Sequence, residues 1–488
     1  MRVNLHEYSG KFYGKREKKM IAAQQHEKGK GFIDRDRLYE ILKRNAPTDG
    51  ELDEILNRAL QLKGLPLDDV ASLLAVEDPA RIRKIQDCAR YVKDEIYGKR
   101  LVLFAPVYTG NLCDNNCVYC AFRKSNTTLK RKILTMSEIE REVHTLLREG
   151  HKRILLICGE TAQNDTDYMC EAIRTSYRTR AGRQYVRRIN LELAPMEVSD
   201  FAKLKAEKIG TYVCFQETYD PVMYRKYHPP GTPKADYEYR VTVMDRAMDG
   251  GVDDVGIGVL FGLSDYRFEI LAIMEHAAHL EALFGCGPHT VSFPRIEPAE
   301  NAPLSLRVPH PVSDDDFKKI IAIVRIALPY TGIILSTREN EEMRTELFSC
   351  GVSQISAGSR TNPGAYGDGE AATGSQFALG DHRSLEEVIN SIVEKGYIPS
   401  FCTGCYRMGR VGGDFMDLAK PGLIKQYCMP NAIFTFKEYL NDFASPATKA
   451  GGVKLIKELI EGVSDENLRE RMMRVLDEID ADKRDIYF

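Results

Sequence analysis

Eight short apolar runs, each followed by an amphipathic segment of helix length, occupy the middle of this 488-residue chain. Runs of this length are typical of buried strands, and their alternation with helices indicates a parallel sheet. Eight repeats predict a (β/α)8 barrel of the TIM type, although a partly open barrel would give the same pattern. The expected strands are Leu101–Val107, Arg153–Cys158, Arg188–Leu193, Thr211–Gln216, Asp253–Val259, His289–Phe293, Gly332–Leu335 and Val352–Ser356.

Helical segments are expected on both sides of this barrel. The pattern assigns residues 98–371 to the barrel, 1–97 to a helical N-terminal extension and 372–488 to a C-terminal extension. Within the barrel, Ser137 and Glu140 have the spacing of a capping box, which predicts that a helix begins there. The extensions are therefore expected to add surface and further sites to a single barrel.

The charge balance excludes several classes of partner. The formal net charge is −3, so neither nucleic acid nor an anionic membrane is an expected partner. No apolar stretch is long enough to cross a membrane, since the longest, Ile320–Leu328, is interrupted by Arg325. A chain of this size does not depend on a disulfide framework, so we expect its twelve cysteines to be ligands or core thiols in a reducing cytoplasm.

Three of these cysteines form a cluster directly after the first expected strand. Cys113, Cys117 and Cys120 have C-x3-C-x2-C spacing. Three thiolates can hold three irons of a 4Fe-4S cubane and leave the fourth iron open. Structural zinc takes four protein ligands, and no fourth Cys or His follows within twenty residues. Zinc and redox thiols remain the alternatives. Because barrel chemistry lies at the C-terminal ends of the strands, the cluster is expected at that mouth.

A second trio lies in the C-terminal extension. Cys402 and Cys405 form C-x2-C, and Cys428 follows after twenty-two residues. The intervening Gly-rich loops are free enough to bring the three thiols together, and the same reasoning predicts a second cubane with an open iron. A zinc site with a ligand from elsewhere, or a reversible disulfide between Cys402 and Cys405, would also account for the pattern.

The first trio, with Tyr119 just before its last cysteine, resembles the signature of the radical SAM enzymes, which bind S-adenosylmethionine (SAM). Together with the second trio, residues 100 to 430 resemble the HydG family, the radical SAM tyrosine lyases that help mature [FeFe]-hydrogenase. The thiazole-synthesis tyrosine lyases (ThiH) share much of the barrel, and the C-terminal cysteine spacing favours the hydrogenase maturases. Other familiar stretches are Phe215–Tyr219, Asp253–Gly258, Gly287–Thr290, Phe293–Arg295 and Leu335–Glu339.

This resemblance implies a reaction and its partners. The first cluster would pass an electron from an external donor to SAM, and the resulting 5′-deoxyadenosyl radical would cleave L-tyrosine to p-cresol and dehydroglycine. Dehydroglycine would give carbon monoxide and cyanide. The second cluster would carry an additional iron bridged by free cysteine, forming an Fe(CO)2(CN) cysteinate unit for the hydrogenase H-cluster, with other hydrogenase maturation proteins as partners. The alternatives are release of dehydroglycine for thiazole (thiamine) synthesis, and a non-catalytic metal scaffold.

Residues at the ends of several strands are candidates for binding SAM. Radical SAM proteins often carry Gly-Gly-Glu after the second strand, and here Gly159 and Glu160 follow Cys158. The Glu160 carboxylate can accept from the SAM ammonium group, or it can form a surface salt bridge. The further candidates are Gly256 and Gly258, where the backbone could approach the adenine or simply pack tightly, and Glu192 and Arg240, which could meet the ribose or the SAM carboxylate.

Three residues are candidates for the substrate and for the additional iron. Arg338 follows the seventh strand and suits the tyrosine carboxylate, unless it pairs with Glu339. Gln216 ends the fourth strand at the same mouth. His289 begins the sixth strand, so it is expected at the opposite mouth, where the resemblance implies a histidine ligand for the additional iron. A hydrogen-bonded barrel histidine is the alternative.

Overall fold

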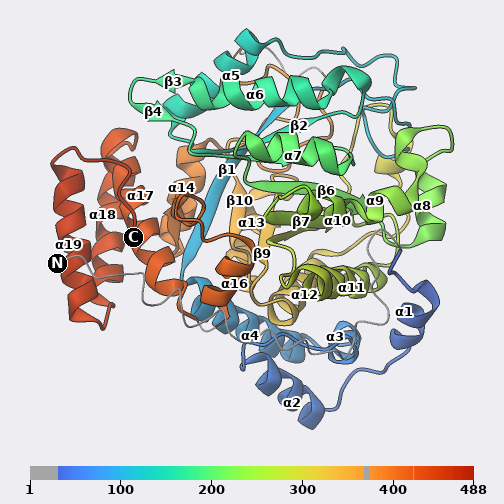
Figure 1. The fold of residues 1–488 in the computed structure, drawn as a ribbon. Coiled ribbons are helices and arrows are strands. Elements are labelled where there is room, and N and C mark those ends of the chain that lie inside the picture. The colour runs from blue at the N-terminus through green and yellow to red at the C-terminus, as the bar shows by residue number, and fades with distance from the viewer. Residues whose placement is uncertain (1–30, 368–373, 421) are drawn as a thin grey trace.

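A computed structural model of the protein describes residues 31–367, 374–420 and 422–488 (Figure 1). Within these residues, eight parallel strands follow one another around a closed barrel, and the last pairs with the first through Val102↔Gln354 and Phe104↔Ser356. The predicted (β/α)8 barrel is confirmed, and this pairing excludes the open form. The strands are β1 Arg100–Gly110, β2 Arg153–Cys158, β5 Arg188–Glu192, β6 Thr211–Glu217, β7 Asp254–Val259, β8 Thr290–Ser292, β9 Gly332–Leu335 and β10 Gln354–Ser356.

Successive side chains of β1 point alternately to the outer core and to the barrel interior. Leu101, Leu103 and Val107 pack outward into the main core, while Phe104 and Tyr108 point into the barrel interior. Successive side chains of a strand point to opposite faces, so an apolar strand contributes to both layers. The interior is therefore lined by aromatic and polar side chains, and the outer layer is sealed by helices.

The outer helices follow the strands in sequence. The first of them begins with a capping box made by Thr135 and Glu138, so the predicted box at Ser137 and Glu140 was wrong by two residues. The helices are α5 Met136–Glu149, α6 Thr166–Arg178, α7 Val198–Ala206, α8 Pro221–Tyr227, α9 Tyr237–Val241, α10 Val243–Asp249, α11 Tyr266–Phe284, α12 Asp314–Ala327, α13 Glu341–Leu347 and α14 Leu385–Glu394. A small hairpin, β3 Arg180–Ala181 and β4 Gln184–Tyr185, follows α6.

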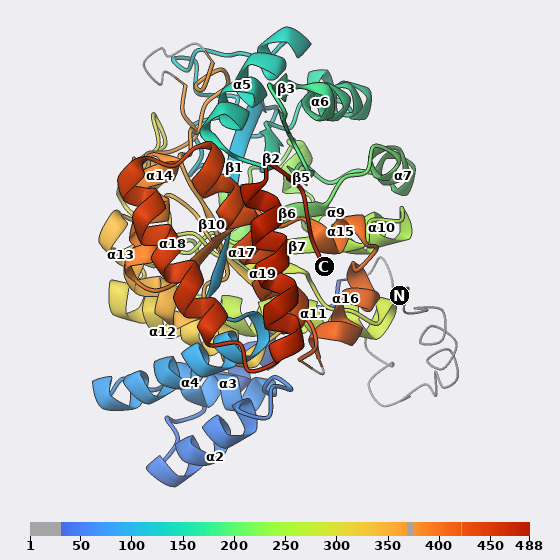
Figure 2. The same cartoon turned by 90° about the vertical axis from the view of Figure 1, so that its left-hand side faces the viewer.

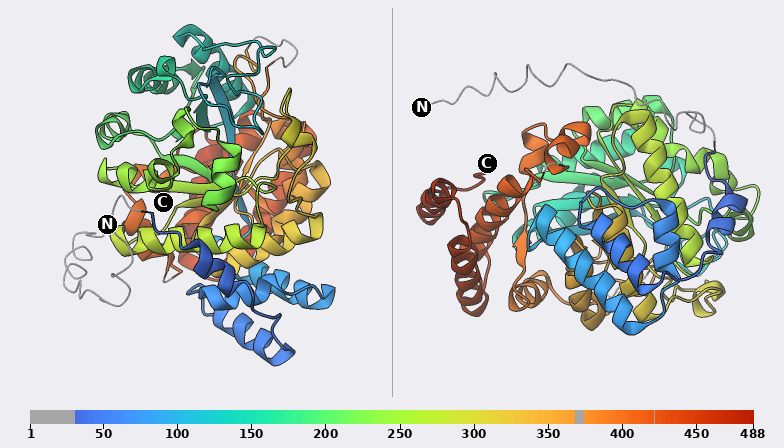
Figure 3. Two further views of the ribbon diagram at one scale, coloured as in Figure 1. Left: turned by 90° about the vertical axis from the view of Figure 1, so that its right-hand side faces the viewer. Right: turned by 90° about the horizontal axis from the view of Figure 1, so that it is seen from below.

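The N-terminal helices pack along one side of the barrel (Figure 3). α3 contacts α11 and α12, and α4 lies along α12. The first thirty residues of the predicted helical extension lie outside the described residues. The helices are α1 Arg35–Ile41, α2 Asp49–Ala59, α3 Leu67–Leu74 and α4 Pro79–Tyr97. None of the helices in the described ranges has the length and apolarity needed to cross a membrane.

The C-terminal segment is joined to the barrel by a strand that the sequence did not reveal. β11, Ile398–Ser400, pairs in parallel with the start of β1 through Arg100↔Ile398. Two short helices then lie beside the starts of β7 and β8, since Tyr406 and the backbone N–H of Gly412 both donate to Asp254 and Phe415 packs on His289. Three longer helices stack on the outside (Figure 2). The helices are α15 Gly404–Arg407, α16 Gly412–Ala419, α17 Lys425–Asp442, α18 Pro446–Glu461 and α19 Glu466–Asp480. The domain boundary predicted at residue 371 lies outside the described residues.

A buried ion-pair network ties the segment after the barrel to α13. Asp381 accepts from Arg344 and from Arg383, whose Nη2 lies 2.6 Å from the carboxylate. Burial raises the pKa of Asp381, but the hydrogen bond from Arg383 and the charge of Arg344 outweigh it and lower the pKa to about 2. The network therefore stabilises the fold fully above the ordinary pKa of Asp, and this contribution is lost as the pH falls towards 2.

Replacing Asp381 by Asn should accordingly destabilise the apoprotein by about 3 kcal/mol at pH 7, because Arg344 is left buried without its anion. Denaturant unfolding at pH 7, 5 and 3 measures this difference. We expect the gap between the intact protein and Asp381→Asn to be unchanged from pH 7 to 5 and to narrow at pH 3. A gap that does not change with pH would contradict the role given to this carboxylate.

Candidate functional site

The first cysteine trio lies at the C-terminal mouth of the barrel, on the loop that follows β1. The backbone N–H of Asp114 donates to the carbonyl of Glu160 at 2.7 Å, which joins this loop to the one after β2. A side chain at Gly159 would collide with the carbonyl of Leu112, so a glycine is needed for the two loops to lie this close. The predicted SAM-side residues Gly159 and Glu160 are thus held against Cys113.

A hydrogen-bond chain beside the cysteines contains residues that the sequence did not single out. Asn115 Nδ2 donates to Glu160 Oε2 at 2.6 Å, and Asn115 Oδ1 accepts from the backbone N–H of Lys234 at 2.7 Å. Lys234 Nζ in turn lies 2.6 Å from Glu217 Oε1. Glu160 therefore has a specific partner in the cysteine loop, and its second oxygen remains to be used by a ligand.

The thiols of this trio lie in a largely apolar setting. Burial raises the pKa of Cys117, and it raises the pKa of Cys120 to about 12, with help from the neighbouring cysteines. Tyr119 is hydrogen-bonded through its hydroxyl to His228 Nε2 at 2.9 Å, which fixes the aromatic ring next to Cys120. A raised pKa keeps the thiols of Cys117 and Cys120 protonated until a metal displaces the proton, which suits ligands rather than free nucleophiles.

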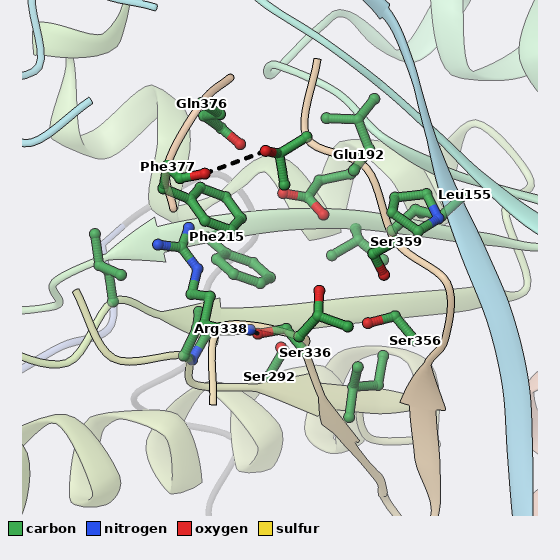
Figure 4. A pocket seen from close by; sticks show the side chains of 18 of the residues that line it. Leu155, Glu192, Phe215, Ser292, Ser336, Arg338, Ser356, Ser359, Gln376 and Phe377 are labelled. Atoms are coloured by element: carbon green, nitrogen blue, oxygen red, sulfur yellow. Dashed lines mark hydrogen bonds between the residues drawn. The ribbon is translucent and has the colours of Figure 1, made fainter. Parts of the chain in front are cut away.

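The barrel interior below this mouth is a cavity of about 130 Å³ (Figure 4). Arg338 points into it and stacks on Phe377, with the guanidinium carbon 3.3 Å from the ring centre. The alternative partner of Arg338 is occupied, because Glu339 pairs with Arg295. Glu192 also lines the cavity, and burial and the charge of Glu217 raise its pKa to about 7. An anion and an amine could both be accommodated here.

The other predicted residues of this mouth lie around the cavity rather than in it. On β6 the lining residues are Val213, Phe215 and Glu217, so Gln216 faces away from the interior. Arg240 Nε donates to the carbonyl of Phe215 at 2.7 Å and thereby holds the strand end.

The two β7 glycines have a packing reason. A side chain at Gly256 would lie 2.5 Å from Thr290 Oγ1, and one at Gly258 would collide with the carbonyl of Ser292. Both contacts are with the neighbouring strand β8. The two strands lie so close together that only glycine fits at these positions.

The second trio surrounds a smaller cavity, of about 60 Å³, at the N-terminal mouth. Cys402 follows β11, Cys405 lies on α15 and Cys428 on α17, and all three line the cavity together with His289. The sequence analysis expected these four residues at the mouth opposite the first trio, and the structure places them there. Cys405 and Cys428 are hydrogen-bonded to each other, and this bond lowers the pKa of Cys405 and raises that of Cys428.

His289 is held by its neighbours as a neutral imidazole. Its Nδ1 lies 3.5 Å from Asp254 Oδ1, and its ring packs on Phe415 at 5.3 Å between centres. Burial lowers the pKa of His289 to about 4, although the charge of Asp254 opposes this. A neutral imidazole oriented by a carboxylate is the form in which histidine binds iron.

The donor sets fit clusters better than single ions. In the part of the chain that the structure describes, no three His, Cys, Asp or Glu side chains converge on a point that could hold one metal ion. A zinc site gathers its four ligands on one ion, whereas a cubane spreads three cysteines over three irons. Two trios, one on the loop after β1 and one around the N-terminal cavity, are compatible with the second arrangement.

The two cavities approach each other inside the barrel. Gln354, at the start of β10, lines both of them, and its side chain reaches across to Gly332 on β9. Gln354 is therefore part of the wall of both cavities.

Comparison with known proteins agrees with this geometry. The family model of the Radical SAM superfamily matches residues 107–277, and that of the Biotin and Thiamin Synthesis associated domain matches residues 292–398. The 2-iminoacetate synthase of Salmonella typhimurium is 30% identical over 375 residues, which cover 76% of this chain and 96% of that protein.

Two solved structures resemble the whole fold. A crystal structure of HydG, a maturase of the [FeFe]-hydrogenase, has a TM-score of 0.90 and 46% identity, covering 93% of this chain and 99% of that one. The [FeFe]-hydrogenase maturase HydG from Carboxydothermus hydrogenoformans has a TM-score of 0.79 and 40% identity, covering 91% of this chain and 97% of that one.

Proposed function

Because the chain belongs to the HydG family of radical SAM tyrosine lyases, the [FeFe]-hydrogenase maturases, we propose that it cleaves L-tyrosine to p-cresol and dehydroglycine. Dehydroglycine then gives carbon monoxide and cyanide, which are collected as an Fe(CO)2(CN) cysteinate unit for the H-cluster. The observation that carries this proposal is the pair of cysteine trios at opposite mouths of one closed barrel. The proposed setting is the reducing cytoplasm, with an external electron donor and other maturation proteins as partners.

At the C-terminal mouth, Cys113, Cys117 and Cys120 would hold a 4Fe-4S cluster and leave one iron for SAM. When bound, this cluster supplies the electron that cleaves SAM to methionine and the 5′-deoxyadenosyl radical. Glu160 accepts from the SAM ammonium group while Asn115 fixes its other oxygen.

In the cavity below the C-terminal mouth, Arg338 binds the tyrosine carboxylate, since its guanidinium faces this cavity and Glu339 is already paired with Arg295. Glu192 accepts from the substrate ammonium or the ribose hydroxyls on the same side. These two groups hold the amino nitrogen near SAM, where hydrogen is removed.

At the N-terminal mouth, Cys402, Cys405 and Cys428 would hold a second 4Fe-4S cluster, and His289 would hold a further iron that takes up free cysteine. This group supplies the site where carbon monoxide and cyanide are collected. A second candidate function is release of dehydroglycine for thiazole assembly, favoured by the likeness to 2-iminoacetate synthase. The second trio is what distinguishes the two, because it has no use in a lyase that releases its product.

The test is anaerobic reconstitution with iron and sulfide, followed by reaction with SAM, L-tyrosine, cysteine and a one-electron reductant that takes the place of the external donor. We expect 5′-deoxyadenosine, p-cresol, carbon monoxide and cyanide, each dependent on tyrosine. Production of p-cresol without carbon monoxide would favour the thiazole function. If no 5′-deoxyadenosine forms in response to tyrosine, the result would favour the alternative that the protein is a non-catalytic metal scaffold.

Replacing Gln354 by Phe should obstruct the interior between the two cavities. We expect p-cresol formation to stay within about twofold and delivery of carbon monoxide to the second site to fall about tenfold, because a ring fills the shared space. Infrared bands of iron-bound carbon monoxide measure delivery, and Gln354→Ala, which opens the passage, is the control. Equal delivery in both variants would indicate another route.

Replacing Glu160 by Gln should weaken SAM binding without removing the hydrogen bond to Asn115, since the amide oxygen can still accept. We expect the KM for SAM to rise about tenfold, because a charge-assisted bond to the ammonium becomes a neutral one. The dependence of 5′-deoxyadenosine formation on SAM concentration measures this. An unchanged KM at equal iron content would remove Glu160 from the SAM site.

A further inference from the structure

The outer side of the first cysteine trio carries apolar side chains that reach the molecular surface. Cys117 belongs to a small buried apolar cluster. The half-buried side chains that pack on this cluster include Val118 from the cysteine loop, Met223 from α8, and Leu304 and Val308 from the segment after β8. Leu306, between the last two, is 72% exposed, which is more than for any other large apolar side chain in the described ranges.

Hydrogen bonds join the three segments that make this face. The backbone N–H of Val118 donates to the carbonyl of Tyr227 at 3.3 Å, which fixes the cysteine loop to the end of α8. A second bond, from Asn126 Nδ2 to the carbonyl of Glu300 at 3.1 Å, fixes the same loop to the segment that contains the exposed leucine. The cysteine loop, α8 and residues 300–308 therefore meet in one surface.

Exposed cations without anionic partners lie on the same segments. Arg225 and Lys226 are exposed in the last turn of α8, and Arg307 is exposed next to Leu306. None of these three cations forms an ion pair with another described residue, and Lys226 only stacks on Tyr227, with 5.4 Å between Nζ and the ring centre. In a chain whose net charge is −3, they give this face a local excess of positive charge.

The carboxylates on these segments do not cancel that excess. Asp114 lies 3.8 Å from Lys124 Nζ within the cysteine loop, so this pair is neutral. Asp220, at the start of α8, is buried and paired with Arg35. Glu300 is exposed and can offset one cation, which leaves the face positive. An apolar centre with a cationic rim has the anatomy of a protein–protein interface for an acidic partner.

We propose that this face is the docking surface for a small acidic protein that carries one electron to the first cluster. The inference rests on the proposed function, which places a reducible cluster on the first cysteine trio and needs an external electron donor. In the step itself the carrier loses one electron and the cluster gains it, and no bond forms or breaks. Docking here brings the carrier against the loop that holds the cluster, while the carboxylates of the carrier meet the three unpaired cations.

The experiment measures how fast the first cluster is reduced in the full chain loaded with both clusters. The probe is reduced flavodoxin, a small acidic one-electron carrier, and dithionite is the comparison because so small a reductant needs no docking surface. Freeze-quench electron paramagnetic resonance follows the reduced first cluster, which is recognised by the change of its signal when SAM is added. The readout therefore does not depend on turnover.

Two variants alter the face and one matched control leaves it intact. Arg225→Glu/Lys226→Glu reverses two cations of the face, and Leu306→Ser removes its apolar tip. The control, Lys454→Glu/Lys457→Glu, changes the net charge by the same amount on α18, which lies on the opposite side of the barrel from α8 (Figure 1). All the side chains to be replaced are exposed, so the fold should tolerate each change.

We expect the second-order rate constant for reduction by flavodoxin to fall about 10- to 100-fold in Arg225→Glu/Lys226→Glu at low ionic strength, because attraction becomes repulsion. Added salt should narrow this difference. Leu306→Ser should lower the rate constant about threefold to tenfold through lost apolar burial. The α18 control should stay within about twofold of the intact protein, and dithionite should reduce every variant within about threefold of the intact rate.

Equal flavodoxin rates in the intact protein and in the α8 double variant would overturn the inference. A similar fall in the α18 control would overturn it too, since net charge and not this face would set the rate, and so would an equal loss with dithionite. If the α8 variant lost binding to vesicles of anionic lipid but kept its flavodoxin rate, the face would belong to a membrane and the inference would fall. A first cluster that dithionite cannot reduce in the intact protein would instead contradict the proposed function.

Discussion

Replacing Cys402 and Cys405 together by alanine is expected to leave p-cresol formation within about twofold of the intact protein and to lower carbon monoxide at least 100-fold, a loss on the order expected when metal ligands are removed. The two thiols line the cavity at the N-terminal mouth, whereas Arg338, Glu192 and Tyr119 line the cavity at the C-terminal mouth. In the proposed function, cleavage of tyrosine depends only on the residues of the C-terminal mouth. Collection of the diatomic products would depend on the thiols of the N-terminal mouth.

Two measurements on the same reconstituted samples test this separation. Chromatography of p-cresol reports the first reaction, and carbon monoxide binding to added deoxyhaemoglobin reports the second. Cys286→Ala/Cys350→Ala is the matched control, because these two buried cysteines lie outside both cavities. If p-cresol disappears together with carbon monoxide while the first cluster is intact, the two mouths do not act separately.

The barrel could be predicted because its strands are buried on both faces. β2 and β9 have the predicted ends, since continuous apolar runs mark such strands clearly. β11 could not be found, because it is three residues long, contains Pro399 and depends for its existence on pairing with β1. The capping box of α5 was misplaced because two overlapping S/T-x-x-E patterns compete there, and only the geometry selects Thr135.

Cysteine spacing located both candidate metal sites, but the residues around them come from distant loops. Asn115 and Lys234 meet Glu160 and Glu217 only after the barrel closes, and no spacing along the chain records this. Glu217 could have been predicted from the sequence, because strand alternation puts its side chain on the interior face and that of Gln216 on the opposite face.

Replacing Arg338 by Gln is expected to lower kcat/KM for tyrosine about 100- to 1,000-fold. The substrate carboxylate loses a charged, bidentate hydrogen-bond partner, and the amino group of tyrosine is then no longer held near SAM. The guanidinium is positioned for this task by stacking on Phe377, and the pairing of Glu339 with Arg295 leaves it available. Burial lowers the pKa of Arg338, so a substrate anion in the cavity also relieves the cost of its charge.

Two tyrosine analogues separate carboxylate binding from general damage to the cavity. 3-(4-Hydroxyphenyl)propionate keeps the carboxylate and should inhibit the intact protein but not Arg338→Gln. Tyramine lacks the carboxylate and should inhibit both proteins equally. Tyrosine-dependent formation of 5′-deoxyadenosine measures both inhibition constants. If Arg338→Gln lost tyramine as well, the residue would be shaping the cavity as a whole, since an amine without a carboxylate gains nothing from a guanidinium.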